Sequence, residues 1–231
     1  MISSYRAETL RALSRSSAAF LALCTALTWF SMVNAGPQHQ TPLWGFRQVA
    51  IFTATLVLGR AAVVAAGDFG SGTIRPWLIS ARTRPGTFLG KLAASATFGL
   101  VTALVTGLAG EAVSGLLGPV PAPAAMALAV AQLGFACVAL AVFGHAAGML
   151  TRSVPVALTV AIGWILPAEA VLQGHSATVD RWLPGNVLQD FTLGGVAAGS
   201  TWAGAAVHAT LPFLALDAIA LALFLRRDVN D

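Results

Sequence analysis

Charged side chains inside long apolar stretches are the residues of this sequence whose types could do chemistry. They are Arg60, Glu111, Glu169 and Asp217. A charge there is costly unless it faces a partner or a water-filled cavity. At about 1.5 Å per residue, Arg60, His145 and Asp217 lie ~8–12 Å from the same side of the predicted spans. We therefore predict that Arg60 pairs with Asp217 and that His145 lies nearby, either to fix helix packing or to serve gating or substrate contact.

Glu111 and Glu169 lie near the other ends of their predicted spans. Exposure to headgroup water is the simplest prediction for both, because a polar group near a helix end can reach the interface.

A second set of candidates lies between residues 68 and 86. Thr73 can cap a short helix over 73–84. Arg75 and Arg82 project from one face of this helix, next to an apolar stripe at helical spacing. The stripe consists of Ile74, Trp77, Leu78 and Ala81. Such a helix would lie across the membrane surface, and an interfacial anchor that joins two spans is its simplest role.

Patterns for catalysis and metal binding are weak. The closest approach to a phosphate-binding loop, at 86–92, has its glycines four apart rather than five and lacks the Ser or Thr that would hold magnesium. Cys24 and Cys137 show no CxxC or Cys/His spacing, and the histidines show no HExxH or other ligand spacing. We assign no catalytic and no metal-binding residue, and we expect this chain not to be an enzyme.

The elements that must hold these residues are apolar helices. Of the 231 residues, 57% are hydrophobic and 10% are charged, against a usual charged share of about 25%. This composition excludes an ordinary soluble domain, and nucleic acid is not expected as a partner despite the formal charge of +4. The apolar runs of roughly 20 residues match the length that crosses a bilayer. We predict an all-α integral membrane protein, a single transmembrane domain over 1–231, with spans at 18–35, 46–66, 88–117, 124–150, 154–173 and 201–225.

Three prolines bear on the shape of the predicted spans. Pro155 opens a span harmlessly, whereas Pro167 and Pro212 should kink or interrupt their helices unless neighbours satisfy the freed carbonyls.

Charge placement predicts the orientation. An N-terminus and a C-terminus in the cytoplasm (N-in/C-in) put ten of the 13 Arg and Lys residues on the cytoplasmic side. The chain start, with apolar Ile2, Tyr5 and Leu10 beside basic Arg6 and Arg11, predicts an N-terminal amphipathic helix on the inner leaflet. The ten Arg and Lys residues that this orientation places on the cytoplasmic side are Arg6, Arg11, Arg15, Arg75, Arg82, Arg84, Lys91, Arg152, Arg226 and Arg227.

The stretch after the second predicted span resembles the signature region of the type-2 ABC exporter permeases. In that family an acidic residue, a Gly-Thr pair and an apolar-basic helix follow the second span. Here these are Asp68, Gly72-Thr73 and residues 74–82, followed by Lys91 at the foot of the third span.

Further segments agree with this resemblance. Residues 6–11 resemble the basic entry helix of the family, and residues 144–152 resemble its end of the fourth span. Two positions depart from the family pattern. Asp68 replaces the more usual Glu, and Ala81 separates a serine from an arginine that are often adjacent.

The resemblance implies a permease subunit that a separate cytoplasmic ATPase drives, with ATP and magnesium on that partner and no cofactor in this chain. It implies a second copy or a similar permease as the other half of the pathway, and a bacterial plasma (inner) membrane as the location. Residues 174–200 would dip back as short outer helices. The helix at 73–84 would be the coupling helix, with docking residues Asp68, Gly72, Thr73, Arg75, Trp77, Arg82 and Arg84.

The cargo implied by the resemblance is a drug, a peptide, a lipid or another amphiphile, moved outward. Two other classes stay open. A stand-alone ion-coupled carrier would use Arg60 and Asp217 as coupling charges and should show interrupted spans in two halves. An intramembrane hydrolase would need a nucleophile and a base at matched depth.

Overall fold

The computed structural model describes residues 2–35, 41–74, 83–117, 120–197 and 199–226. These residues form helices and no strand, and six candidate spans are long and apolar enough to cross a membrane. The predicted all-α membrane protein with six candidate spans is thereby confirmed. The helices are α1 (Ile2–Ala12), α2 (Arg15–Ala35), α3 (Pro42–Gly70), α5 (Arg84–Leu117), α6 (Pro123–Thr151), α7 (Val154–Gly163), the π-helical turn η2 (Trp164–Ala168), α8 (Glu169–Leu172), α9 (Ala177–Arg181), α10 (Pro184–Leu193) and α11 (Trp202–Arg226).

Proline stands in the first turn of α3, α6, α7 and α10. Its missing N–H breaks no intrahelical bond there, so Pro155 opens α7 as predicted. Before α3, the hydroxyl of Thr41 accepts a hydrogen bond from the amide of Trp44, with 3.2 Å between Oγ1 and N. These residues set where the long helices begin.

Pro167 interrupts the fifth candidate span, as predicted. The span consists of α7, η2 and α8, and the amide of Glu169 donates to the carbonyl of Trp164, five residues back. Because proline offers no amide to the regular ladder, the chain adopts a π-helical turn at this position. The interruption predicted at Pro212 does not occur, since α11 runs through it as one helix.

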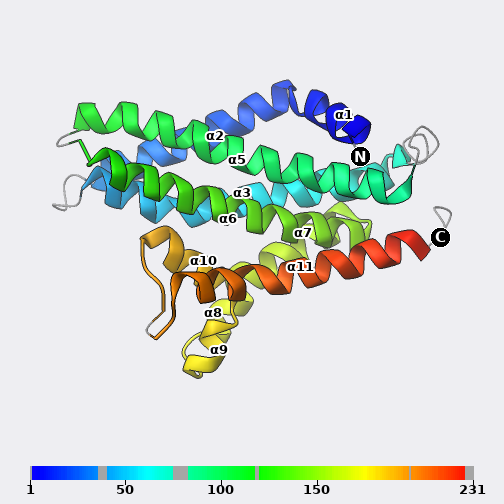
Figure 1. Ribbon diagram of the computed structural model, residues 1–231. Helices are drawn as coiled ribbons and strands as arrows, with labels where there is room; N and C mark the ends of the chain where they lie inside the picture. Colours follow the sequence, from blue (N-terminus) through cyan, green and yellow to red (C-terminus); the bar gives the residue numbers. More distant parts are fainter. Residues whose placement is uncertain (1, 36–40, 75–82, 118–119, 198, 227–231) are drawn as a thin grey trace.

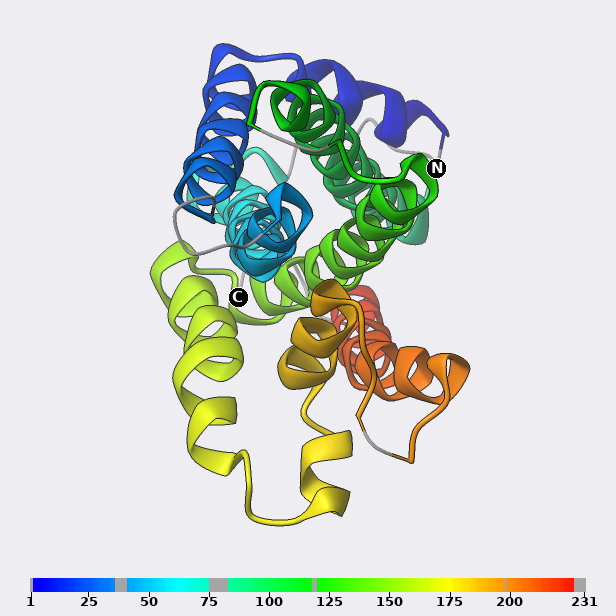
Figure 2. The same cartoon turned by 90° about the vertical axis from the view of Figure 1, so that its left-hand side faces the viewer.

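The central pair of the bundle is α3 and α6 (Figures 1 and 2). Helix α5 packs on α6, α2 packs on α3 and α5, and α7 packs on α3 and α6. The region 174–200 contains α9 and α10, and α10 packs back on α3, α6 and α11. Helix α11 packs mainly on α6 and α10.

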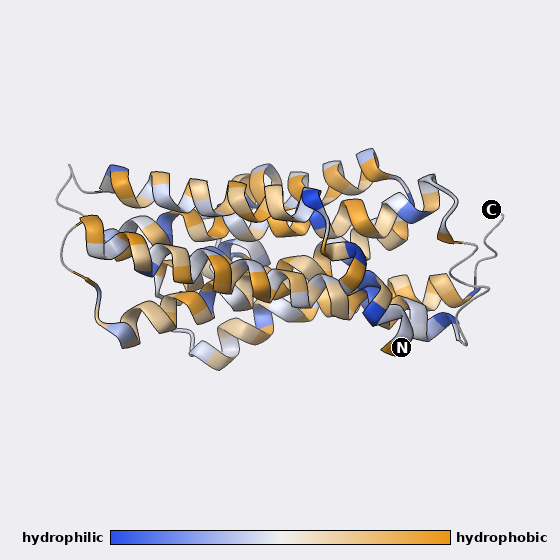
Figure 3. Cartoon of the chain, turned by 90° about the horizontal axis from the view of Figure 1, so that it is seen from above, coloured by the Kyte–Doolittle hydropathy of each residue, from blue (hydrophilic) through white to orange (hydrophobic). Residues whose placement is uncertain are grey.

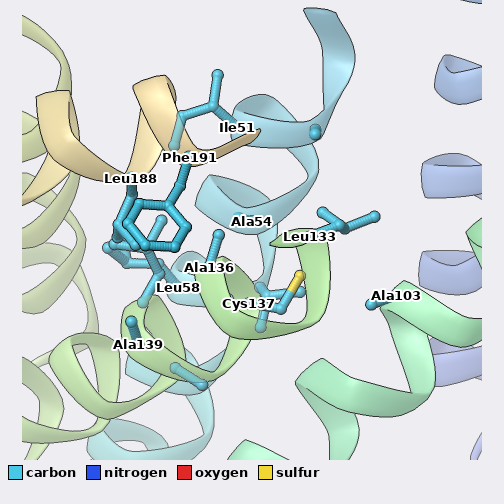
Figure 4. Packing of buried hydrophobic residues seen from close by; sticks show 14 of the residues in the cluster. Ile51, Ala54, Leu58, Ala103, Leu133, Ala136, Cys137, Ala139, Leu188 and Phe191 are labelled. Carbon is cyan, nitrogen blue, oxygen red and sulfur yellow. The ribbon is translucent and has the colours of Figure 1, made fainter. Parts of the chain in front are cut away.

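Small residues bring α3 and α6 together. A Cβ added at Gly144 would lie 2.2 Å from the Leu58 carbonyl oxygen, and one at Gly148 would lie 2.7 Å from the Ala62 carbonyl oxygen. Such close backbone approach gives membrane helices the packing that the hydrophobic effect does not supply in lipid. The buried cluster around this contact also takes side chains from α5 and α10 (Figure 4); it includes Ala54, Ala103, Leu133, Ala136, Leu188 and Phe191.

The start of α1 and the end of α11 lie at the same end of the bundle (Figure 1), which is called the terminal end below. Arg84 begins α5 and Arg226 ends α11 at this end of the bundle. Strongly hydrophilic colour gathers around α1 near the N-terminus, whereas the long helices are largely apolar (Figure 3). Glu8, Asp68 and Lys91 are among the charged residues where α1 meets the bundle.

Candidate functional site

A groove lies between α2 and α7, and residues of α3 form its base. Its volume is about 1140 Å³, and it opens on the side of the bundle. Its lining is mainly apolar and aromatic, which suits an apolar ligand with a few fixed polar contacts. The polar residues among those that line it are Ser31, Asn34, Gln48, Thr55 and Arg60.

Arg60 is the charged residue of this groove. Its Nη2 donates to the Ser17 hydroxyl at 2.6 Å. Its guanidinium carbon lies 4.1 Å from the ring centroid of Phe98 and 5.5 Å from that of Phe20. Cation–π contacts of this kind stabilise a cation but bring no negative charge. Arg60 also lines a small cavity of about 30 Å³ toward α1 and α5, next to Glu8 and Lys91, which has room for about one water.

Four charged side chains meet on the other side of this small cavity. The Lys91 ammonium contacts the carboxylates of both Glu8 and Asp68. Arg11 Nη1 lies 2.7 Å from Asp68 Oδ1, and the Thr73 hydroxyl donates to the same oxygen at 2.9 Å. These five residues form the Lys91 cluster, which joins α1, the end of α3 and the start of α5.

Three members of the Lys91 cluster are buried. Lys91 is 2%, Glu8 4% and Asp68 0% exposed. Two carboxylates against two cations leave the cluster without net charge, and buried ions are tolerated when they are paired in this way. The hydrogen bond to Asp68 raises the pKa of the half-exposed Arg11 guanidinium, so Arg11 stays charged. The cluster ties α1 to the connection between α3 and α5.

The expected docking residues have different positions. Asp68 is fully buried, and its carboxylate contacts Arg11, Lys91 and Thr73. Gly72 is exposed with φ of 71°, a backbone conformation that favours glycine. Thr73 binds Asp68, and Arg84 is exposed at the start of α5. Arg75, Trp77 and Arg82, and with them most of the predicted coupling helix at 73–84, lie outside the described residues.

The ion pair predicted between Arg60 and Asp217 does not form. Instead, His145 Nδ1 lies 2.8 Å from Asp217 Oδ1, so the predicted proximity of His145 and Asp217 is confirmed. The His145 ring also meets the edge of Phe88, with centroids 4.7 Å apart. The predicted pairing was wrong because depth along a helix does not give the direction in which a side chain faces around the helix axis. Depth places two residues at one level, but Arg60 faces α2 and α5, whereas α11 carries Asp217 on the α6 side of the bundle.

Glu169 also differs from its prediction. It is 3% exposed, and its Oε2 accepts a hydrogen bond from the Asn186 amide at 2.9 Å. The start of α10 folds over Glu169 and buries it, and a carboxylate there stabilises free amides of the first helical turn. Glu111, by contrast, is exposed as predicted.

Sequence reasoning missed Glu8 as a member of a buried cluster. One acidic residue in a basic surface helix gives no sign of a partner 83 positions along the chain. A usable signal did exist for Asp68 and Lys91. They lie near adjoining ends of consecutive antiparallel helices, where opposite charges can meet in the low-dielectric interior.

Comparison with known proteins identifies no family for this chain. The chain matches no known protein-family model, and no curated protein is significantly similar to it in sequence.

Proposed function

We propose that this chain is the membrane-spanning subunit of an ABC exporter of the type-2 class. The single observation that carries the proposal is the groove on α2, α3 and α7. It is long, mainly apolar and open along one side, as half of a pathway for amphiphiles would be. A second copy, or a similar permease, facing this groove would close it.

The Lys91 cluster also supports the proposal, because it could transmit movement from a partner to the spans. A subunit without its own ATPase must receive movement from a partner at one end of the bundle. The cluster joins α1 and the α3–α5 connection to the feet of two long helices, so a force on either surface element would reach the spans. The proposal sets the terminal end in the cytoplasm because its Arg and Lys residues favour that side, in the plasma membrane of a bacterium.

The experiment is copurification followed by reconstitution. The chain is isolated from native membranes under mild conditions, and the recovered complex is placed in vesicles with an amphiphilic dye. We expect a stoichiometric ATPase and dye movement that requires ATP and magnesium on the terminal side. Failure to recover any nucleotide-binding protein, together with movement that is independent of ATP, would overturn the proposal.

A matched pair of variants sharpens the docking part of the proposal. Arg82→Glu reverses a charge at the predicted coupling helix, and Arg181→Glu reverses one in α9. We expect the first to reduce ATPase recovery and the second to leave it unchanged. Equal recovery with both variants would contradict docking through the 73–84 helix.

A stand-alone ion-coupled carrier is the second candidate, and the His145–Asp217 pair favours it. His145 Nδ1 lies 2.8 Å from Asp217 Oδ1, and the pair is almost fully buried between α6 and α11. Movement of a compound that follows a proton gradient without nucleotide, and that Asp217→Asn abolishes, would select this candidate.

A further inference from the structure

The groove on α2, α3 and α7 is apolar along most of its length and carries one positive charge. Among its lining residues, Arg60 is the charged one, and the others are apolar, aromatic or neutral polar. A molecule in this groove would therefore meet apolar walls and one guanidinium. Apolar walls with one guanidinium suit an amphiphile whose head is negatively charged.

The charge of Arg60 has no carboxylate partner within the described residues. Its contacts are the Ser17 hydroxyl and the rings of Phe20 and Phe98. Glu8 faces the same small cavity but is bound to Lys91. The Lys91 cluster as a whole has no net charge, so it does not offset Arg60. An arginine inside a membrane protein without a counter-ion is a position where an anion is expected.

We propose that this groove binds an acidic amphiphile, that is, an alkyl or acyl chain with a phosphate or carboxylate head, and that the head lies on Arg60. The planar guanidinium matches these oxyanions through paired hydrogen bonds. This inference rests on the proposed function in one respect, because it takes the groove as the place where the exported molecule sits.

The geometry also gives the direction in which the alkyl or acyl tail of the bound amphiphile would lie. Arg60 lies nearer the terminal end of α3, and Trp44 lines the groove near the start of that helix. Their separation of 16 positions corresponds to about 24 Å along the helix. The tail of the ligand would run from Arg60 toward Trp44 over apolar residues of the three helices, namely Leu27, Phe52, Leu158 and Ile162.

The test is photolabelling of the chain alone in nanodiscs of neutral lipid. The probes are hexadecyl phosphate and hexadecanol, each with the same diazirine in its chain, so that they differ in charge at the head. We expect the phosphate to label the groove helices α2, α3 and α7 and to bind at least about tenfold more tightly than the alcohol, as hydrogen bonds to a charged group allow.

Variants at Arg60 test whether this residue causes the preference for the phosphate over the alcohol. Arg60→Gln should remove the preference for the phosphate and leave alcohol labelling unchanged, while Arg60→Lys should retain part of it. Arg15→Gln removes one charge from an exposed position on α2 and should leave the preference intact. Equal binding of the two probes to the wild-type chain, labelling outside the groove helices, or a preference that survives in Arg60→Gln would each overturn the inference.

The outcome is independent of the ATPase. Labelling that depends on Arg60 without any associated nucleotide-binding protein would keep the binding site and reject the exporter. An ATPase partner together with equal binding of both probes would keep the exporter and reject the acidic cargo.

Discussion

Lys91 and Arg60 are two cations within the same bundle, and the charges around them differ. Lys91 is fully enclosed and contacts two carboxylates. Arg60 is half-buried beside a large groove and contacts a hydroxyl and two aromatic rings. A cation whose charge is matched inside the protein stabilises the fold, whereas one with no carboxylate partner among the described residues, next to an open groove, is available to a ligand. The predictions below test this difference.

The largest effect is expected from Lys91→Met. The variant leaves the carboxylates of Glu8 and Asp68 close together without their shared cation, and breaking such a buried arrangement costs about 3–5 kcal/mol. Thermal unfolding in detergent, or recovery of monodisperse protein, measures the loss. The control is Arg15→Met, which removes an exposed cation and should change stability little. A loss from Lys91→Met no larger than that of the control would refute the structural role.

A smaller loss is expected from Asp217→Leu. It leaves His145 Nδ1 buried without its partner, which costs about 1–3 kcal/mol. Asp217→Asn keeps a hydrogen-bonding group and should cost less. Denaturant unfolding of both variants provides the comparison, and identical losses would show that the hydrogen bond does not hold α11 on α6.

Arg60→Gln is expected to cost little stability, ~1 kcal/mol or less. The lost hydrogen bond to Ser17 and the ring contacts are partly offset because a charge no longer has to be desolvated. The same unfolding assay that serves Lys91→Met measures this change. A loss as large as that of Lys91→Met would remove the distinction between the two cations.

The smallest effect concerns the partly buried carboxylate of Asp190. Burial raises the pKa of Asp190 in α10, so the folded state holds this proton more tightly than the unfolded chain. Stability from this group is therefore greatest at low pH and falls as pH rises from about 4, the ordinary aspartate value, through the raised pKa. Asp190→Asn should flatten that slope in unfolding measured against pH, whereas Glu111→Gln, at an exposed position, should not. A slope that is unchanged in Asp190→Asn would contradict this assignment.

The helices were predictable because their signals are local. Runs of apolar residues gave six spans, and Pro167 interrupts its span because it lacks an amide. The partners of charged side chains were less predictable. Arg60 and Asp217 share a depth but face different neighbours, and residue counting along a helix carries no information on rotation about its axis. Glu169 is buried because α10 folds over it, which follows from tertiary packing alone.

The groove could not be predicted from the sequence either, because it also depends on tertiary packing. It combines α2 and α3 with α7, which α5 and α6 separate from them along the chain, and its polar residues stand singly among apolar ones. Arg60 was recognised as unusual because of its apolar surroundings, but its place beside a groove depends on how the three helices pack.

The central claim is that Arg60 serves a ligand while Lys91 holds the fold. The most direct measurement compares Arg60→Gln with wild type in vesicles that contain the purified complex, with ATP-driven export of hexadecyl phosphate and thermal stability recorded on the same samples. We predict that Arg60→Gln loses at least about tenfold in export while it unfolds close to the wild-type temperature. Undiminished export of hexadecyl phosphate by a well-folded Arg60→Gln complex would contradict it.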